Sequence, residues 1–316
     1  MERDVSVASG AQVVKALRSR GHEVVAVDAE RGILSQEQET AVFARGIDRK
    51  PPAKAGVSSL PRVISELPGK GFAVVFIAMH GTGGEDGSLQ ALLDLYGLKY
   101  TGSGRLGSAL AWDKGIAKQL FVNAEVPTPD WLLAPATGDE VSARLGFPVI
   151  VKPTGQGSTV GLTLVEQPGE LAGAIDLAAR FDADVLIERF VPGRELTVGI
   201  LDDVPLAVGE IIPAKGGIFD YEAKYQPGGA AEVFPADIPA ELAASVQTLG
   251  LAAHRALKLE DYSRADFRLD PEGGVWCLEV NTLPGLSSGS LLPRSAKAVG
   301  IDFAELCERI CAAALR

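Results

Sequence analysis

Residues 264–290 read RADFRLDPEGGVWCLEVNTLPGLSSGS, and this stretch predicts a β-hairpin. Two runs that alternate apolar and polar side chains, 264–270 and 275–281, flank the turn signal Pro271-Glu272-Gly273-Gly274. Side chains alternate between the two faces of a strand, so every second residue of each run shares a face. The polar residues of this hairpin are therefore expected to gather on one side of a sheet.

A four-residue turn fixes which residues of the hairpin face one another. The pairs that follow are Asp270–Val275, Asp266–Glu279 and Arg264–Asn281. Two carboxylates directly opposite on a sheet repel each other. With the amide oxygen of Asn281 they suit a hard cation such as Mg²⁺, which takes oxygen ligands and brings substrate phosphates with it. The alternative is a solvated face whose acids point at water; we favour the metal site because apolar neighbours such as Phe267 indicate a packed hairpin.

The composition is that of an ordinary globular protein. The chain has 316 residues, of which 47% are hydrophobic and 22% charged, enough for two or three modest domains. A net charge of −11 argues against a nucleic-acid or membrane-surface binder. The longest apolar run, Phe72–Met79, is too short to span a bilayer, and the polar start resembles no signal peptide. We expect a cytoplasmic protein without membrane or nucleic-acid partners.

The cysteines agree with a reducing compartment. Cys307 and Cys311 lie one helical turn apart, but no CxxC pair or histidine accompanies them, and Cys277 stands alone. This spacing is typical of neither a disulfide framework nor a zinc site. We therefore expect three buried, reduced thiols.

The first hundred residues predict an α/β domain. The expected elements are a helix over Ser9–Ser19, a strand over His22–Asp28, a helix over Leu60–Leu67, a buried parallel strand over Phe72–Met79, a helix over Ser88–Tyr96 and a short strand over Leu98–Thr101. Such a domain normally opens with a central strand. Only eight residues precede the first helix, so the expected domain lacks its first strand.

His80 follows the buried strand and begins the loop His-Gly-Thr-Gly-Gly-Glu-Asp-Gly. Ligands of open α/β sheets bind beyond the carboxyl ends of the strands, where His80 is expected. A hydrogen-bonded structural histidine fits this position equally well, and the sequence does not decide between the two.

The run Gly102–Gly107 matches GxGxxG and opens a helix that carries Asp113-Lys114. A dinucleotide site also needs an acid at the end of a second parallel strand. Glu125 has the right distance along the chain, but it precedes Val-Pro-Thr-Pro, a loop. We therefore reject the dinucleotide-binding interpretation.

A strand that ends in Lys152-Pro153 is followed by a loop with Gly155, Gly157 and Gly161, and then by another strand. Glycines let backbone N–H groups approach phosphate oxygens, and the hydroxyls of Ser158 and Thr159 add donors. No GK[ST] sequence occurs, so this is not a Walker A loop. The pattern favours a strand–loop–strand cover over phosphates rather than a plain hairpin turn.

The rest of the chain predicts alternating helices and strands around a long loop. The expected elements are a helix over Glu170–Arg180, strands over Val185–Phe190, Glu195–Leu201 and Pro205–Ile212, a loop over 213–234, and helices over Pro239–Leu257 and Phe303–Leu315. An aromatic-rich long loop of this kind favours a functional lid. Glu188 is a candidate for holding an adenine and Glu195 for holding a ribose, although both could equally be surface acids.

Taken in order, these motifs resemble the ATP-grasp superfamily, and within it the D-alanine–D-alanine ligase family. The motifs that carry the resemblance are HGTGGEDGSLQ, YTGSG, Asp113-Lys114, VIVKP with its glycine loop, VLIERF, DYEAKY, RADFRL and LEVNTLPGLS. They are specific in combination, and the likeness runs through nearly the whole chain. The fold implied is an N-terminal open parallel α/β domain over 1–102, a central ATP-grasp subdomain over 103–188 and a C-terminal subdomain over 189–316.

The resemblance implies ATP-dependent joining of two D-alanines for peptidoglycan precursors, by way of an acyl phosphate, with ADP and phosphate released. It implies an ATP site formed by Lys114, Lys152, Gly157, Ser158, Glu188, Arg189, Val191 and Glu195. The lysines contact phosphates, the glycine loop covers them, Glu188 with the following backbone lines the adenine, and Glu195 takes the ribose. Two Mg²⁺ ions, with Mn²⁺ as a substitute, are held by Asp266, Glu279 and Asn281.

The resemblance also implies positions for both amino acids. Arg264 and the backbone at Gly285 stabilise charge at the acyl carbon. The second D-alanine's carboxylate is positioned by Ser290, Leu291 and Lys224, and the first D-alanine lies near His80, with Glu2 on its ammonium group. Glu2, Ser158 and Tyr225 form the hydrogen-bonded set that latches the lid. A homodimer is expected from the resemblance alone.

The chain departs from the family at its N-terminus. The family's first strand ends in Gly-Gly-x-Ser-x-Glu, and this chain begins one residue before the position that matches the glutamate, Glu2. We expect Met1 to be an internal start or a cut in a longer chain. A nucleotide-binding protein that this truncation has inactivated is therefore one alternative. Another is a ligase with a different product, such as D-Ala–D-Lac or another dipeptide, although Lys224-Tyr225 and His80 favour the dipeptide.

Overall fold

The structure, a computed structural model, describes residues 3–44, 59–157, 159–213 and 230–316. Its described helices are α1 (Arg3–Ser19), α2 (Gln36–Phe43), α3 (Leu60–Ser65), α4 (Ser88–Leu95), α5 (Arg105–Trp112), α6 (Lys114–Asn123), α7 (Gly138–Arg144), α8 (Leu171–Ala178), α10 (Ala240–Ala256), α11 (Leu291–Ala298) and α12 (Phe303–Ala314). Within these residues, no helix has the length and apolarity needed to cross a membrane.

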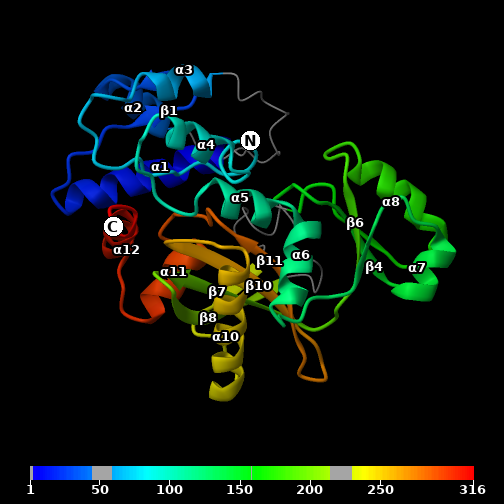
Figure 1. The fold of residues 1–316 in the computed structure, drawn as a ribbon. Helices are drawn as coiled ribbons and strands as arrows, with labels where there is room; N and C mark the ends of the chain where they lie inside the picture. The colour runs from blue at the N-terminus through cyan, green and yellow to red at the C-terminus, as the bar shows by residue number, and fades with distance from the viewer. Residues whose placement is uncertain (1–2, 45–58, 158, 214–229) are drawn as a thin grey trace.

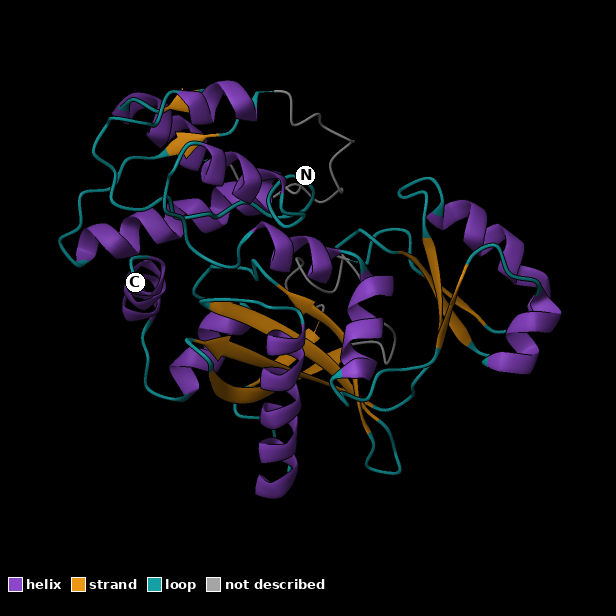
Figure 2. Ribbon diagram, in the orientation of Figure 1, coloured by secondary structure: helices purple, strands orange, loops and turns teal. Residues whose placement is uncertain are grey.

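Strands from the described residues form three sheets (Figure 1). The strands are β1 (Val27–Asp28), β2 (Gly32–Ile33), β3 (Trp131–Leu133), β4 (Val149–Pro153), β5 (Thr163–Val165), β6 (Val185–Arg189), β7 (Arg194–Leu201), β8 (Val204–Pro213), β9 (Ala230–Val233), β10 (Tyr262–Leu269) and β11 (Val275–Asn281). A five-stranded antiparallel sheet has the order β11-β10-β7-β8-β9, and a four-stranded sheet has the order β3-β6-β4-β5. Figure 2 shows the two larger sheets side by side, with α7 and α8 on the outer side of the smaller one.

The five-stranded sheet is covered by helices on both faces. Val198 faces α10, where the Cβ of any residue replacing Gly250 would lie 2.5 Å from it. The next residue along β7, Gly199, lies against Leu292 of α11. Because consecutive residues of a strand point to opposite faces, the two helices lie on opposite sides of the sheet. Arg264 and Asp266 of β10 lie on the α11 side, and Ala265 and Phe267, fully buried, pack on the α10 side.

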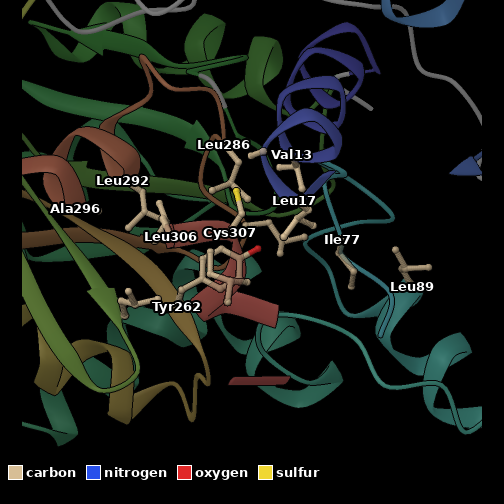
Figure 3. Close-up of a cluster of buried hydrophobic side chains, with 14 of the residues drawn as sticks. Val13, Leu17, Ile77, Leu89, Tyr262, Leu286, Leu292, Ala296, Leu306 and Cys307 are labelled. Carbon is tan, nitrogen blue, oxygen red and sulfur yellow. The ribbon is translucent and has the colours of Figure 1, made fainter. Parts of the chain in front are cut away.

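A shared core joins the two ends of the chain (Figure 3). Val13 and Leu17 of α1 pack in one cluster with Tyr262 of β10 and Leu306 of α12. The loop after β11 contributes Leu283 and Leu286 to the same cluster. Figure 3 labels Leu286 together with several other members, among them Ile77, Leu292 and Cys307. Burial of these side chains therefore fixes the N-terminal residues against the end of the hairpin.

The first helix is longer than the sequence prediction. We expected it to begin at Ser9, and it begins at Arg3. Val5, Ser9 and Val13 are buried at a spacing of four residues, which is the helical period. The predicted start was six residues late because Val5 is the one buried apolar residue before Ser9, so the periodic pattern is weak there.

Two strands predicted in the N-terminal part are wrong in their extent. Of His22–Asp28 only Val27–Asp28 pairs, antiparallel with β2. The segment Phe72–Met79 makes a single parallel bridge, between Val75 and Tyr100, beside the predicted short strand. Apolar character predicted that the segment is enclosed, but a ladder also needs a neighbouring strand that matches it in length. The bridge keeps the parallel direction that the open α/β arrangement requires.

The hairpin has the predicted register at one end only. Arg264 faces Asn281 and Asp266 faces Glu279, as the sequence predicts. Toward the turn the register shifts by one, so Leu269 and not Asp270 faces Val275, and Leu278 has no partner. An extra residue of this kind is a β-bulge. It reverses the alternation of β11, so that Cys277 and Val280 lie in the core while Glu279 faces the opposite side.

Two further boundaries differ from the prediction. The Asp113-Lys114 pair does not lie within one helix: α5 ends at Trp112, and Asp113 caps α6 by accepting a hydrogen bond from the Ile116 amide. An aspartate that accepts from the third following amide is a typical N-cap. The loop expected over 213–234 ends in strand β9, which pairs with β8. The remainder of that loop lies outside the described residues.

We predict a pH dependence of stability from His254. This imidazole is 1% exposed and shares a hydrogen bond of 2.7 Å with Ser263, and burial lowers its pKa to about 4. The unfolded chain therefore binds more protons between pH 4 and 6.5, and stability is lost as the pH falls through this range. Between pH 7 and 5 the loss is about 1–2 kcal/mol.

Urea unfolding of the wild type and of His254→Gln at several pH values checks this. The variant should lose less stability than the wild type between pH 7 and 5, because its side chain does not titrate. Comparing the two isolates His254 from Asp261, whose burial raises its pKa to about 6 and acts in the opposite direction. Parallel pH profiles for the two proteins would contradict the prediction.

Candidate active site

A cavity of about 470 Å³ lies between α1, the two larger sheets and the loop that follows β11. Most of the residues that the sequence singles out border it. Those on its wall are His80, Lys114, Lys152, Gly157, Glu195, Arg264, Asp266, Glu279, Asn281, Gly285, Ser290 and Leu291. The fold thus gathers into one place residues that are more than two hundred positions apart in the chain, from His80 to Leu291.

Asp266 is the most heavily hydrogen-bonded acid of this wall. Arg264 grips its carboxylate with two parallel bonds, from Nε to Oδ1 at 2.9 Å and from Nη2 to Oδ2 at 2.7 Å. Thr197 donates to Oδ1 at 2.7 Å, and the amide nitrogen of Asn281 donates to Oδ2 at 3.0 Å. A bidentate arginine–carboxylate pair is strong and fixes both partners. The carboxylate of Asp266 is therefore fixed in position at the cavity wall.

Glu279 pairs with the lysine that begins α6. The Lys114 ammonium lies 3.3 Å from Glu279 and donates to the Gln156 carbonyl at 2.7 Å. It also reaches the Thr154 carbonyl at 3.4 Å. The lysine therefore ties the hairpin to the start of the glycine loop, and its side chain is 10% exposed. This contact therefore joins Lys114, a predicted phosphate-binding lysine, to Glu279, a predicted metal-binding acid.

The second lysine, Lys152, shares Glu188 with a lysine that the sequence analysis missed. Lys152 donates to Oε2 of Glu188 at 2.9 Å, and Lys118 donates to Oε1 at 2.6 Å. Burial alone would raise the pKa of Glu188, but the two ammonium charges outweigh it and hold that pKa below its ordinary value. Burial lowers the pKa of Lys152, and the charges of Glu188 and Glu279 more than compensate, so that this pKa is raised.

A helical spacing could have found Lys118. It lies four residues after Lys114, so both lysines project from the same side of α6. The side chain of Lys118 is 0% exposed, whereas that of Lys114 reaches the cavity. The sequence does not show that Lys118 is buried more deeply than Lys114, because the partner of Lys118 comes from a strand seventy residues away.

The remaining predicted ATP residues lie near this group. Glu195 borders the cavity and lies 3.6 Å from Arg268. The guanidinium of Arg189 lies over the Trp276 ring at 4.7 Å, and its backbone N–H donates to Asp130. The Val191 carbonyl accepts from Arg268 at 3.1 Å. Glu188, Arg189 and Val191 do not border the described cavity, so their assignment to an adenine pocket stays a prediction.

His80 connects α1 with the loop after β11. Its Nδ1 lies 2.9 Å from the Leu283 carbonyl, which can only accept, so Nδ1 carries a proton. In the neutral ring Nε2 then accepts from the Ser9 hydroxyl, 2.9 Å away. The Ser6 hydroxyl accepts from the His80 backbone amide at 2.9 Å. The ring, 4% exposed, thus borders the cavity with both nitrogens engaged, and the two serines are residues that the sequence analysis missed.

Gly285, Ser287, Gly289, Ser290 and Leu291 also border the cavity. The hydroxyls of Ser287 and Ser290 are 2.7 Å apart, and a Cβ at Gly285 would lie 3.0 Å from the Ser290 hydroxyl. A side chain at Gly285 would therefore press on Ser290. Leu291 begins α11 and packs against Ile211 of β8. Small residues keep this loop open to the cavity.

Four predicted residues lie outside the described part of the chain. They are Glu2, Ser158, Lys224 and Tyr225.

The donor set on the hairpin fits a hard divalent cation in kind. Asp266 and Glu279 offer carboxylate oxygens and Asn281 an amide oxygen, all on one side of two paired strands. Among the described residues, no group of three or more His, Cys, Asp or Glu side chains is arranged to hold a metal. The set is thus two acids and one amide, as the sequence predicts, with Arg264 and Lys114 as their present partners.

Comparison with known proteins gives the same answer along the whole chain. Residues 1–103 match the family described as "D-ala D-ala ligase N-terminus", and residues 112–312 match "D-ala D-ala ligase C-terminus". A D-alanine–D-alanine ligase of Geobacter sulfurreducens is 43% identical over 312 residues, covering 98% of this chain and 89% of the relative. One from a Synechococcus species is 40% identical over 322 residues, covering 100% of this chain and 90% of the relative.

A solved structure is similar in three dimensions as well. The D-alanine–D-alanine ligase of Bacillus anthracis, complexed with ATP, superposes with a TM-score of 0.78 at 29% sequence identity, covering 100% of this chain and 94% of that one. The two larger sheets and the cavity between them are thus an ATP-grasp fold. From the family matches and the close relatives together, the chain belongs to the D-alanine–D-alanine ligase family.

Proposed function

We propose that this protein joins two molecules of D-alanine with ATP, giving D-alanyl-D-alanine, ADP and phosphate, for the synthesis of peptidoglycan precursors. The observation that carries the proposal is the cavity wall, on which paired lysines, hairpin acids and the His80 cluster surround one space of about 470 Å³. A polyphosphate, a carboxylate and an amine all find partners of opposite charge on it.

The phosphate end of the reaction needs positive charge and little else from the protein. Phosphoryl transfer depends mostly on positioning and on charge neutralisation. Lys114 and Lys152 border the cavity and supply ammonium groups. Mg²⁺, or Mn²⁺ in its place, would be held by Asp266, Glu279 and Asn281 and would add positive charge beside the phosphates; two ions are our expectation. Glu188, Arg189, Val191 and Glu195 are proposed for the nucleoside, and Gly157 for covering the phosphates.

The chemistry proceeds in two steps. The carboxylate of the first D-alanine attacks the γ-phosphorus of ATP, ADP leaves, and an acyl phosphate forms. The amine of the second D-alanine then attacks the acyl carbon, phosphate leaves, and the amine loses a proton. Arg264, with its guanidinium on the cavity wall, and the backbone of Gly285 are proposed to stabilise the oxygen charge that develops at that carbon.

The two amino acids occupy different parts of the cavity in this proposal. The first lies against His80 and α1, and the second has its carboxylate near Ser290 and Leu291. The roles of Glu2, Ser158, Lys224 and Tyr225, given above, rest on the family resemblance. A homodimer that works in the cytoplasm is proposed on the same ground.

We predict that ADP release depends on D-alanine. The wild-type protein with ATP and Mg²⁺ should release ADP when D-alanine is added and should form D-alanyl-D-alanine in equal amount. A coupled enzyme assay measures the ADP, and mass spectrometry identifies the product.

Two controls separate the alternatives. D-Alanine with D-lactate should give no more ADP than D-alanine alone, because the proposed acceptor is an amine. Formation of a D-alanyl ester with D-lactate would identify a ligase of different specificity. ATP binding without any D-alanine-dependent ADP release would identify a nucleotide-binding protein and refute the proposed function.

We predict that removing the charge of Glu279 weakens the use of the metal. Glu279→Gln should raise the Mg²⁺ concentration for half-maximal activity by about tenfold or more, since a metal site that loses a carboxylate loses its most strongly attracting ligand. Titration of activity with Mg²⁺ at saturating ATP measures this.

Glu272→Gln is the matched control, because Glu272 is an exposed acid in the turn of the same hairpin. It should leave the Mg²⁺ requirement unchanged. Equal shifts in both variants would mean that hairpin stability, and not a ligand, governs the metal dependence.

We predict that Ser9 acts on D-alanine through His80. Ser9→Ala removes the hydrogen bond to Nε2 at 2.9 Å, so the ring loses one of its two anchors. We expect the KM of the first D-alanine to rise about fivefold, which corresponds to one hydrogen bond of about 1 kcal/mol. Steady-state kinetics at saturating ATP give the value.

Ser19→Ala serves as the control in the same helix, since the Ser19 hydroxyl donates only to the Ala16 carbonyl. It should leave this KM unchanged. A drop in kcat with unchanged KM for Ser9→Ala would contradict a role in D-alanine binding.

A further inference from the structure

Lys118 is a buried cation to which the proposed reaction gives no task. Its side chain is 0% exposed, and its ammonium donates to the Thr128 hydroxyl and to Glu188, each at 2.6 Å. The ammonium also lies 5.2 Å from the centre of the Trp131 ring. It does not border the cavity. Burying an ammonium group is unfavourable unless it is paired, so its partner explains how it is tolerated but not why it is there.

Lys118 shares its partner with a lysine of the cavity. Glu188 accepts from Lys118 on Oε1 and from Lys152 on Oε2, at 2.6 and 2.9 Å. One carboxylate is therefore shared by two lysines. Lys152 is the member of the three that borders the cavity. The way in which Glu188 is shared thus acts on the cavity through Lys152.

The backbone holds the three groups in this arrangement. In the β4–β6 ladder Lys152 faces Leu186, so Glu188 is the diagonal neighbour of Lys152 on the same face of the sheet. Lys118 approaches from α6, and its second partner, Thr128, donates to the Cys277 carbonyl of β11 at 2.8 Å. Helix α6 and both sheets meet at this point, so Glu188 has little freedom to turn toward Lys152 alone.

We propose that Lys118 is a positioning residue that sets the affinity of the cavity for polyphosphate, by sharing Glu188 with Lys152 so that Glu188 offsets less of the Lys152 charge at the cavity wall. Without Lys118, the carboxylate of Glu188 would have Lys152 as its one lysine partner. The identification of the polyphosphate as that of ATP rests on the proposed function; the charge balance does not.

The test measures binding of inorganic tripolyphosphate by calorimetry, because this probe has the charge of the nucleotide and no adenine. Lys118→Met removes one positive charge and leaves the Glu188–Lys152 pair intact. Lys118→Gln is its companion, since glutamine keeps a hydrogen-bond donor without the charge. We expect both variants to bind tripolyphosphate about tenfold more weakly than the wild type, a change of about 1.4 kcal/mol.

Two further variants distinguish charge from structural support. Glu188→Gln removes the negative charge that faces Lys152 and should bind tripolyphosphate at least as tightly as the wild type. The double variant Lys118→Met with Glu188→Gln also leaves Lys152 without this acid and should regain most of the affinity lost in Lys118→Met. Lys15→Met, which removes an exposed charge on α1, should have no effect.

Opposite outcomes would overturn the inference. If Lys118→Gln binds tripolyphosphate like the wild type, the hydrogen bond and not the charge is what counts. If the double variant binds more weakly than Lys118→Met, the group is structural. Thermal unfolding of every variant accompanies the calorimetry, and Lys118→Gln, which keeps a hydrogen-bond donor, carries the test if Lys118→Met does not fold.

The failure of this inference differs from a failure of the proposed function. A wild-type protein that releases no ADP with D-alanine refutes the function, while tripolyphosphate binding still decides the role of Lys118. If the wild type is active, Lys118→Met should raise the KM for ATP about tenfold and leave the KM for D-alanine unchanged. An unchanged KM for ATP would refute the inference and leave the function standing.

Discussion

The structure depends on the neutralisation of two acids that face each other across a hairpin. Asp266 and Glu279 are opposite in the β10–β11 ladder, where like charges repel. Arg264, two residues from Asp266 on the same strand, grips one of them, and Lys114 from α6 pairs with the other. The first cation is supplied by the hairpin itself, but the second has to be brought by a separate helix. The packing of α6 against β11 is therefore a condition for this acid pair.

The same alternation of charge continues away from the hairpin. Lys152 is influenced by both Glu279 and Glu188, and Glu188 reaches on to the buried Lys118. Acidic and basic side chains thus alternate from Glu279 through Lys152 and Glu188 to the buried Lys118. Neighbours in this series come from different helices and strands. A bound polyphosphate or divalent cation would enter this series by replacing existing partners. Groups already fixed in position need little reorganisation on binding, which is how charged sites gain strength in a protein interior.

The sequence predicted local features well and long-range contacts poorly. The facing of Arg264 and Asn281 agrees with the prediction because the bulge at Leu278 offsets a one-residue shift of the pairing at the turn. Neither the shift nor the bulge was predicted, since a bulge leaves no signal in the pattern of polar and apolar residues. Lys118 and Ser9 were missed for a different reason. Each is recognised as part of the site by a hydrogen bond to a residue about seventy positions away, Glu188 and His80 respectively. The start of α1 was missed because Val5 is the one buried apolar residue of its first turns before Ser9.

Motif content, in contrast, identified the family from the sequence alone. The residues of HGTGGEDGSLQ and LEVNTLPGLS lie far apart in the chain, yet they border one cavity through His80, Glu279 and Gly285. The two-residue pairing of β1 and the single bridge at Val75 show the limit of the approach, since apolar runs predict burial better than they predict sheet partners.

The unpaired Leu278 has a consequence for protein engineering. A regular ladder would leave Glu279 on the side of Cys277, in the apolar core, and a hairpin redesigned for ideal pairing would bury that acid. The turn at 271–274 can be shortened or replaced, because it lies beyond the irregularity and carries no cavity residue. Strand β11 tolerates no such change, because the direction of its side chains reverses at Leu278. Removing one residue would turn every later side chain of the strand to the other face of the sheet.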